Sequence, residues 1–258
     1  MGRRPAYGGG EPSTTQGEPR PEEALGYSAP VKDTDDTRPA GPDCCGHAPD
    51  PRIARYFDAA AGRSGDTNDL PPAKRVSVAL LAELRDVGEI QPTVLELGCG
   101  MGALSVSLVE LGASRATGID LSPGSIEVAT RRATRAGLEA QTAFAVGDGA
   151  SATLTPHDWV VLDRMICCYR HAGRLLENAI PAARRRIAFS IPESRGGRGI
   201  VNRPLWFAEN VINFAMRPYC PGYVHDIRVI EDRLHRAGFS RLRSGHSRLW
   251  YLAVFERR

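Results

Sequence analysis

Apolar and polar positions alternate in blocks from Thr93 to the end of the chain. Short apolar runs, which predict strands, are separated by longer stretches with helical periodicity. A regular succession of strand and helix is the pattern of βα units, which build a mainly parallel sheet with helices packed on its faces. The predicted strands span 94–97, 115–119, 141–146, 159–162, 186–191, 239–243 and 249–255, and the predicted helices between them span 103–111, 122–136, 171–183 and 227–237. We therefore predict an α/β fold.

The first part of the chain lacks this pattern. Residues 1–50 are rich in Pro, Gly, Ser, Thr and charged residues and contain almost no aliphatic side chains. Such a segment cannot bury enough apolar surface to offset the entropy lost on ordering, so we predict a disordered tail. Order is expected to begin at Ile53–Asp58, where apolar and aromatic residues first cluster, and a second helix is expected from Ala73 to Leu84. The folded domain is therefore predicted to span 51–258.

A long segment, 199–223, separates the fifth predicted strand from the last predicted helix. It exceeds the length of a plain connection and is rich in large apolar side chains. Two interpretations are open. The segment is either an amphipathic lid insert over an apolar ligand or a helix that packs on the edge of the sheet.

A glycine-rich turn follows the first predicted strand. It reads Gly98-Cys99-Gly100-Met101-Gly102, and the strand residue two places before it is an acid, Glu96. Glycines let a ligand approach the backbone N–H groups at the start of the next helix. The spacing differs from the G-x-G-x-x-G of dinucleotide-binding turns, and a carboxylate here repels a pyrophosphate but suits an ammonium group. The turn therefore favours a cofactor that carries an amino acid, such as S-adenosylmethionine.

Two more acids follow neighbouring strands. Asp120 closes the second strand, where it can accept hydrogen bonds from both hydroxyls of a ribose, and Asp148 follows the third, where it can accept one from the adenine amine. The carboxyl ends of parallel strands meet at one edge of the sheet, so an adenosine-bearing ligand is predicted there. The candidate cofactor-binding residues are Glu96, Gly98, Cys99, Gly100, Gly102, Asp120, Leu121, Asp148, Gly149 and Asp163.

Three segments in this order, Glu96–Gly102, Gly118–Asp120 and Gly147-Asp148, resemble the motifs of class I S-adenosylmethionine-dependent methyltransferases. The resemblance extends over residues 90–255. It implies a Rossmann-like sheet of seven strands, with helices on both faces and the last strand antiparallel, and S-adenosylmethionine as methyl donor. It also implies an acceptor pocket roofed by an N-terminal helical cap and by inserts. The expected enzyme transfers a methyl group to a small, partly apolar organic acceptor.

Some segments are similar to magnesium-protoporphyrin O-methyltransferases. These segments are Tyr56–Asp58, Gly65–Asn68, Met101–Ser105 and Tyr223–His225. Where that family has a histidine after the fourth strand, this chain reads Ile166-Cys167-Cys168-Tyr169. A tetrapyrrole acceptor therefore stands as an alternative to other small acceptors.

Methyl transfer needs mainly alignment of the donor and the acceptor, and a base helps only when the acceptor carries a proton. Tyr169, His171 and His225 are the catalytic candidates, because they follow the fourth strand or precede the last helix, where the acceptor is expected. A histidine at a helix start is also a common structural residue, whose ring nitrogens satisfy nearby backbone groups.

Charge and hydropathy narrow the range of partners. The chain has 33 Lys and Arg against 30 Asp and Glu, a net charge of +3, which gives no basic stripe for a nucleic acid. We find no apolar run long enough for a membrane span and no secretion signal, so a cytoplasmic protein is expected. Arg131, Arg132 and Arg135 are expected on a solvated helix face. The sequence carries no signal for an oligomeric state.

Free thiols are the expected state of the six cysteines, Cys44, Cys45, Cys99, Cys167, Cys168 and Cys220. Cys44 and Cys45 lack the two-residue spacer usual for paired zinc ligands, so no metal site is predicted. Two further functional classes remain to be tested. A Rossmann-type oxidoreductase is disfavoured by the glycine spacing and by Glu96, whereas a non-catalytic S-adenosylmethionine-binding protein fits the same motifs.

Overall fold

The computed structural model describes residues 51–63, 70–87, 93–215 and 220–258. Within them, seven strands form one sheet in the order β3-β2-β1-β4-β5-β7-β6. Neighbouring strands from β3 to β5 are parallel, and β7 is antiparallel to both β5 and β6. The strands are β1 (Thr93–Leu97), β2 (Arg115–Asp120), β3 (Thr142–Val146), β4 (His157–Asp163), β5 (Ala183–Pro192), β6 (Phe239–Ser247) and β7 (Trp250–Arg257).

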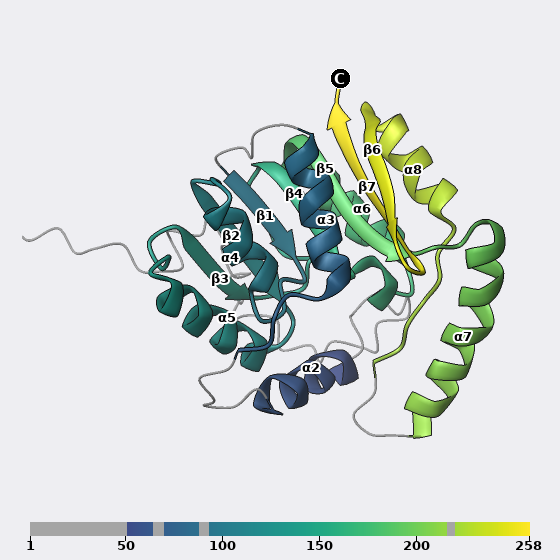
Figure 1. The fold of residues 1–258 in the computed structure, drawn as a ribbon, viewed down its shortest axis with the longest axis horizontal. Helices are drawn as coiled ribbons and strands as arrows, with labels where there is room; N and C mark the ends of the chain where they lie inside the picture. Colours follow the sequence, from purple (N-terminus) through teal and green to yellow (C-terminus); the bar gives the residue numbers. More distant parts are fainter. Residues whose placement is uncertain (1–50, 64–69, 88–92, 216–219) are drawn as a thin grey trace, which may run out of the picture.

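Helices cover both faces of the sheet, as Figure 1 shows. On one face lie α3, α4 and α5, and on the other lie α6 and α8. Two more helices lie outside these layers: α2 crosses below the carboxyl ends of the parallel strands, and α7 stands at the edge of the molecule (Figure 1). The helices are α2 (Pro51–Arg63), α3 (Arg75–Asp86), α4 (Ala103–Glu110), α5 (Pro123–Ala136), the short 3₁₀ helix η1 (Ile166–Cys168), α6 (Ala172–Ala182), α7 (Gly196–Ala215) and α8 (Ile227–Arg236).

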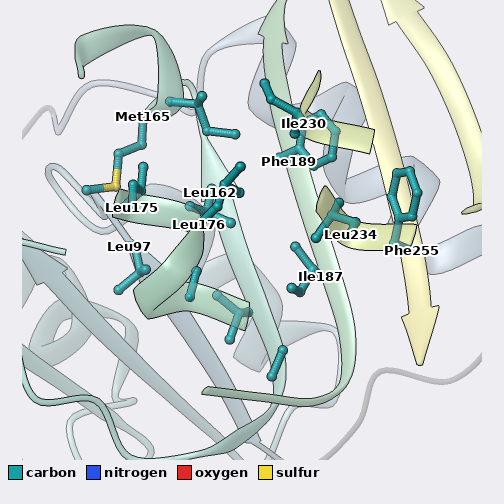
Figure 2. Close-up of a cluster of buried hydrophobic side chains, with 14 of the residues drawn as sticks. Leu97, Leu162, Met165, Leu175, Leu176, Ile187, Phe189, Ile230, Leu234 and Phe255 are labelled. Atoms are coloured by element: carbon teal, nitrogen blue, oxygen red, sulfur yellow. The ribbon is translucent and has the colours of Figure 1, made fainter. Parts of the chain in front are cut away.

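Two apolar clusters hold these layers together. The larger joins α6 and α8 to the sheet, and Figure 2 shows Leu175 and Leu176 of α6 beside Leu97 and Leu162 of the sheet. The smaller cluster packs α3 and α4 on the opposite face. Because both faces are covered, the central strands β1 and β4 are almost wholly buried and are mainly apolar at their centres.

Local signals explain where α5 begins and ends. The Ser122 hydroxyl accepts a hydrogen bond from the Ser125 N–H at 3.0 Å, and Pro123 occupies the first turn. At the other end Gly137 adopts a left-handed conformation with φ of 67°. These signals fix the start of α5 directly after Asp120.

The predicted fold class is confirmed: a mixed sheet of seven strands with helices on both faces and β7 antiparallel. β6 is longer than expected, because Ser244–Ser247 continue pairing with β7 past an irregularity at Arg241/Arg243. The predicted tail, 1–50, lies outside the described residues, as do Cys44 and Cys45. None of the described helices is long and apolar enough to cross a bilayer.

The predicted insert near 199–223 begins inside α7, which starts at Gly196. This helix is joined to the rest of the protein by polar and aromatic side chains. Asn202 Nδ2 donates to the carbonyls of Glu193 and Leu249, both at 2.8 Å, and the Trp206 ring packs edge-on against Trp250 at 5.9 Å. Residues 199–215 of the segment thus belong to a helix beside the end of β5 and the start of β7, and the role of the segment as a lid stays a prediction.

Candidate functional site

The glycine-rich turn is built from left-handed backbone. Gly98 and Gly102 both have φ of 74°, and a Cβ at either would lie 2.8 Å from an atom of Met165 or Ala129. Gly100 differs: its φ is 51°, yet a Cβ there would meet nothing within 4 Å. Two glycines therefore let the turn pack closely, whereas Gly100 borders open space where a ligand can approach the backbone.

Asp120 holds this turn in place. Its carboxylate accepts hydrogen bonds from the N–H of Gly100 and the N–H of Ser122, each at 2.9 Å. Burial raises the pKa of Asp120, although the two N–H bonds favour its charged form. Each carboxylate oxygen keeps a second lone pair, so Asp120 can order the turn and still accept a ribose hydroxyl.

Glu96 is a buried acid beside the turn. The Ser105 hydroxyl of α4 donates to its Oε2 at 2.5 Å. Burial is the main cause that raises its pKa to about 8, and nearby Asp163 and Asp120 raise it further. A buried carboxyl of this kind is protonated near neutral pH when no cation is present, and a ligand ammonium would favour its ionised form.

Asp163, at the end of β4, is the third acid near the carboxyl ends of the parallel strands, after Glu96 and Asp120. Its two oxygens accept hydrogen bonds from the hydroxyls of Ser190 and Ser77, each at 2.5 Å. The next residue, Arg164, has φ of 54° and a side chain that approaches Asp163 at 3.5 Å. A non-glycine residue in this region is uncommon and concentrates at functional sites. The sequence did not single out Arg164; its place directly after a buried strand ending in an acid was the available signal.

Asp148 lies in the loop after β3. It accepts hydrogen bonds from the Tyr169 hydroxyl at 2.5 Å and from the Ala150 N–H at 3.0 Å. Burial, and then the charge of Asp148, raise the pKa of Tyr169 well above its usual range. Tyr169 is therefore a hydrogen-bond donor and not a base. The structure brings these two candidates together, although the sequence assigned them to different ligands.

The two candidate histidines have different surroundings. His225 Nε2 lies 2.8 Å from the Tyr169 carbonyl and donates to it, and burial lowers the pKa of His225. The N–H of Tyr223 also donates to the Cys167 carbonyl at 2.8 Å, so the segment before α8 is tied to η1. His171 is exposed at the start of α6 and makes no side-chain cap.

The remaining candidates occupy the same edge. Leu121 is half-buried between Asp120 and Ser122. A Cβ at Gly149 would lie 2.7 Å from Met165, and the Gly149 carbonyl accepts a hydrogen bond from Asn178. Cys99 is buried behind the turn, and burial raises the pKa of its thiol.

Helix α2 is attached to this edge through Asp58, which was not among the candidate site residues. Asp58 Oδ1 accepts hydrogen bonds from the Ser122 hydroxyl at 2.6 Å and from the Gly124 N–H at 3.0 Å. The acid of one helix thus caps the first turn of another. α2 is consequently held directly beside Asp120.

The prediction of a solvated face for the three arginines of α5 is wrong for Arg132. Its guanidinium donates to the carbonyls of Met101, at 2.9 Å, and Pro71, at 2.7 Å, and burial lowers its pKa. Two carbonyls from distant segments converge on this helix position, which periodicity alone does not reveal. Arg132 thereby supports the glycine-rich turn from outside.

Two thiols of η1, Cys167 and Cys168, lie beside the thiol of Cys220. Cys167 and Cys168 both direct their sulfur atoms at the Arg164 carbonyl, at 3.2 and 3.6 Å, and hydrogen bonds from Cys167 and Cys220 lower the pKa of Cys168. The described cysteines are free thiols. Within the part of the chain that the structure describes, no group of three His, Cys, Asp or Glu side chains is placed to hold a metal ion.

Comparison with known proteins agrees with this arrangement. Residues 94–187 match the model of a methyltransferase domain family. A release factor glutamine methyltransferase of Rhodospirillum rubrum is 39% identical over 107 residues, which cover 41% of this chain and 31% of that protein. The chain therefore spans about a third of the length of the curated relatives it matches.

Solved structures share the fold over a larger part of the chain. The magnesium protoporphyrin IX methyltransferase of Synechocystis PCC 6803 with bound S-adenosylhomocysteine superposes with a TM-score of 0.60 at 20% identity, over 80% of this chain and 98% of that one. An O-methyltransferase of neocarzinostatin biosynthesis superposes with a TM-score of 0.55 at 15% identity, over 81% of this chain and 59% of that one. Residues 94–187 are thus similar to a methyltransferase domain family, and the chain shares the fold of these solved methyltransferases.

Proposed function

We propose that the chain binds S-adenosylmethionine at the edge formed by β1, β2 and β4 and transfers its methyl group to a small organic acceptor. One observation carries the proposal. The buried carboxyl of Glu96, the carboxylate of Asp120 and the open side of Gly100 lie together at one sheet edge. This set suits an ammonium group, ribose hydroxyls and a close backbone approach, in the order in which S-adenosylmethionine presents them.

The residues present fit this cofactor. Glu96 would hold the ammonium group, Asp120 the ribose and Asp148 the adenine, with Gly100 open to the ligand. When bound, S-adenosylmethionine supplies a methyl group on a positively charged sulfur, which needs no further activation. The contribution of the chain is then alignment, which can account for about 7–11 kcal/mol of the barrier in favourable cases.

Tyr169 and His225 are proposed to position the acceptor. Tyr169 keeps its proton, because it donates to Asp148 and its pKa is raised, so it can orient an acceptor but not deprotonate it. Burial lowers the pKa of His225, so this ring is neutral near pH 7 and can receive a proton. The proton of an acceptor hydroxyl, amine or thiol leaves to such a base or to water as the acceptor–methyl bond forms.

The small size of the acceptor rests on two observations. The O-methyltransferase of neocarzinostatin biosynthesis was crystallised with 1,4-dihydroxy-2-naphthoic acid, and a tetrapyrrole is the substrate named for the Synechocystis protein. A protein acceptor is the second candidate, because the release factor glutamine methyltransferase is 39% identical over 107 residues. A tetrapyrrole, the alternative acceptor that the sequence suggested, counts as one of the small acceptors in this proposal.

One experiment separates these candidates. The full chain is incubated with methyl-labelled S-adenosylmethionine and, in parallel, with the small-molecule fraction of an extract, the protein fraction, or magnesium protoporphyrin IX. Label in the small-molecule fraction supports the proposal, and label in the protein fraction alone contradicts it. Measured cofactor binding without any transfer would identify a non-catalytic binding protein, and binding of a nicotinamide dinucleotide instead would identify an oxidoreductase.

A cofactor-site variant and a matched control make the result specific. Asp120→Ala is expected to weaken binding of S-adenosylmethionine and S-adenosylhomocysteine about ten- to a hundredfold, the value of a charge-assisted hydrogen bond. Asp158→Ala removes an acid at the opposite, amino end of β4, where it accepts bonds from Thr93. Equal loss of affinity in both variants would mean that general destabilisation, and not contact with the cofactor, is the cause.

A further inference from the structure

α7 exposes its large apolar side chains. On a helix of a globular protein these positions normally face the core. Here seven of them are half or more exposed: Ile200 (75%), Phe207 (70%), Phe214 (70%), Ile212 (60%), Val211 (56%), Val201 (52%) and Leu205 (50%). Contiguous apolar surface of this kind marks an interaction site.

The exposed residues form one continuous face. A helix turns by about 100° per residue, and on that wheel the seven residues, together with Pro204 and Ala208, fall within an arc of about 180°. The remaining arc holds Arg198, Asn202, Arg203, Trp206, Glu209 and Asn210. α7 is therefore an amphipathic helix: none of the named polar residues falls within the arc of the exposed apolar residues.

Asn202, Trp206 and Asn210 of the polar arc face the protein, whereas its charged residues are exposed. Asn202 bonds to the carbonyls of Glu193 and Leu249, Trp206 packs on Trp250, and Asn210 exchanges hydrogen bonds with Gly222 at 2.6 and 2.8 Å. These bonds fix the rotation of the helix about its axis. The apolar arc is thereby held outward, at the edge of the molecule where Figure 1 places α7.

Exposed arginines lie at both borders of the apolar arc. Arg203 adjoins the border on the side of Phe214, and Arg198 adjoins the border on the side of Leu205, where the exposed acid Glu209 follows it on the wheel. Such side chains can extend their guanidinium groups to headgroups while their stems stay among apolar groups. We propose that the apolar arc of α7 lies on the surface of a lipid bilayer that carries anionic headgroups.

Two other occupants fit this face less well. Residues 1–50 of the same chain contain few aliphatic side chains to cover it. A second copy packed on the same arc would bring the arginine borders of the two helices together, and like charges at a contact are unfavourable. Anionic headgroups have the opposite charge and need no matching shape.

The test is flotation of the full chain with vesicles, without cofactor, so its result does not depend on the methyl-transfer proposal. Vesicles of phosphatidylcholine containing phosphatidylglycerol are expected to carry the protein upward, and vesicles of phosphatidylcholine alone are expected to carry much less. Raising the salt concentration should weaken binding to the vesicles that contain phosphatidylglycerol, because salt screens the attraction between arginines and anionic headgroups.

Two valine variants form a matched pair. Val211 is 56% exposed on the apolar arc of α7, and Val229 is 53% exposed on α8. Val211→Asp should weaken vesicle binding about tenfold or more, since it loses buried apolar area and adds a charge that anionic lipid repels. Val229→Asp should leave it unchanged. Because both positions face solvent, both variants are expected to keep the parent melting temperature.

Several results would overturn the proposal. Binding that is insensitive to Val211→Asp would place the lipid contact elsewhere, and absence of flotation with anionic vesicles would remove it. If sedimentation in solution shows a dimer that Val211→Asp dissociates while vesicles are not bound, the face is an interface between two copies. Arg198→Glu with Arg203→Glu should weaken binding only when phosphatidylglycerol is present, and equal loss on neutral vesicles would contradict the role of charge.

Discussion

At the scale of single residues, Gly100 is the position where the cofactor proposal can be tested with least damage to the fold. A Cβ at Gly100 would meet no neighbouring atom, so Gly100→Ala costs only the left-handed conformation, about 1–2 kcal/mol. If the cofactor lies against this backbone, the added methyl group occupies its place. We expect affinity for S-adenosylhomocysteine, measured by calorimetry, to fall at least about tenfold.

Gly137 provides the matched control. It has φ of 67°, also borders open space, and ends α5 away from the glycine-rich turn. Gly137→Ala should therefore lower the melting temperature by a similar amount and leave cofactor affinity unchanged. If both variants bind the cofactor equally well, the open side of Gly100 is not the binding surface.

The raised pKa of Glu96 leads us to expect that cofactor binding releases a proton. Burial raises its pKa to about 8, so the ligand-free protein holds this proton at pH 7, and a ligand ammonium should displace it. Calorimetry of S-adenosylhomocysteine binding in buffers of different ionisation enthalpy counts the protons released. The difference between the parent and Glu96→Gln should approach one proton near pH 7 and vanish above pH 9. A constant difference at all pH values would contradict this role.

The same carboxyl links stability to pH. Its folded pKa, about 8, lies above its usual value of 4.5, so between these values the folded chain holds a proton that the unfolded chain has released. The free energy of unfolding of the ligand-free protein therefore falls as pH rises through this interval. Glu96→Gln should lack this contribution, whereas His157 and His225, whose pKa values are lowered by burial, contribute equally in both proteins.

At the scale of elements, the contact between α2 and α5 is expected to control cofactor release. Asp58→Ala removes two hydrogen bonds to Ser122 and Gly124, worth about 2 kcal/mol together, and detaches α2 from the edge that holds Asp120. If α2 covers the cofactor, stopped-flow dissociation of S-adenosylhomocysteine should accelerate several-fold, and hydrogen exchange in α2 should increase.

Asp158 matches Asp58 closely. It is also half-buried and also accepts one hydroxyl and one N–H bond, both from Thr93 at the amino end of the sheet. Asp158→Ala should cost similar stability without changing the dissociation rate. Equal acceleration in both variants would show that α2 is a packing element and not a cap.

Sequence periodicity located the strands well because a strand buried on both faces is mostly apolar. β1 was expected at 94–97 and β2 at 115–119, within one residue of their observed bounds. Tethers between distant segments have no such pattern. The bonds from Arg132 to Met101 and Pro71, and from Ser122 to Asp58, depend on the tertiary arrangement, so no spacing along the chain reveals them.

α7 illustrates another limit. Its sequence contains Gly196, Gly197, Gly199 and Pro204, which disfavour helix, and its apolar residues suggested a face that packs inward or onto a ligand. The structure turns Asn202 and Asn210 of the polar face toward the protein instead, where they bond to the carbonyls of Glu193 and Gly222. Periodicity predicts two faces but does not tell which one meets the protein.

At the scale of the whole molecule, the resemblance carried by the glycine-rich turn and the successive acids predicted a sheet of seven strands with the last one antiparallel, as the structure has it. They could not predict the surroundings of Asp148 and Asp163. Both acids were assigned to the cofactor from their place after a strand, yet Asp163 accepts two serine hydroxyls and Asp148 accepts Tyr169. Which neighbouring side chains donate hydrogen bonds to these two acids depends on how all the layers of the fold pack together.

The last prediction concerns which part of the chain is needed for cofactor binding. Residues 1–50 are poor in aliphatic side chains, so they are expected to contribute little buried area. A chain that begins at Pro49 should therefore keep the melting temperature and the cofactor affinity of the full chain. A chain that begins at Leu70 also lacks α2, and with it the bonds from Asp58 to the start of α5. It should retain the circular dichroism of the sheet and helices but bind S-adenosylhomocysteine more weakly. If the shorter deletion already abolishes binding, residues 1–48 belong to the site. If neither deletion weakens it, α2 does not cover the cofactor, and the edge of the sheet binds it alone.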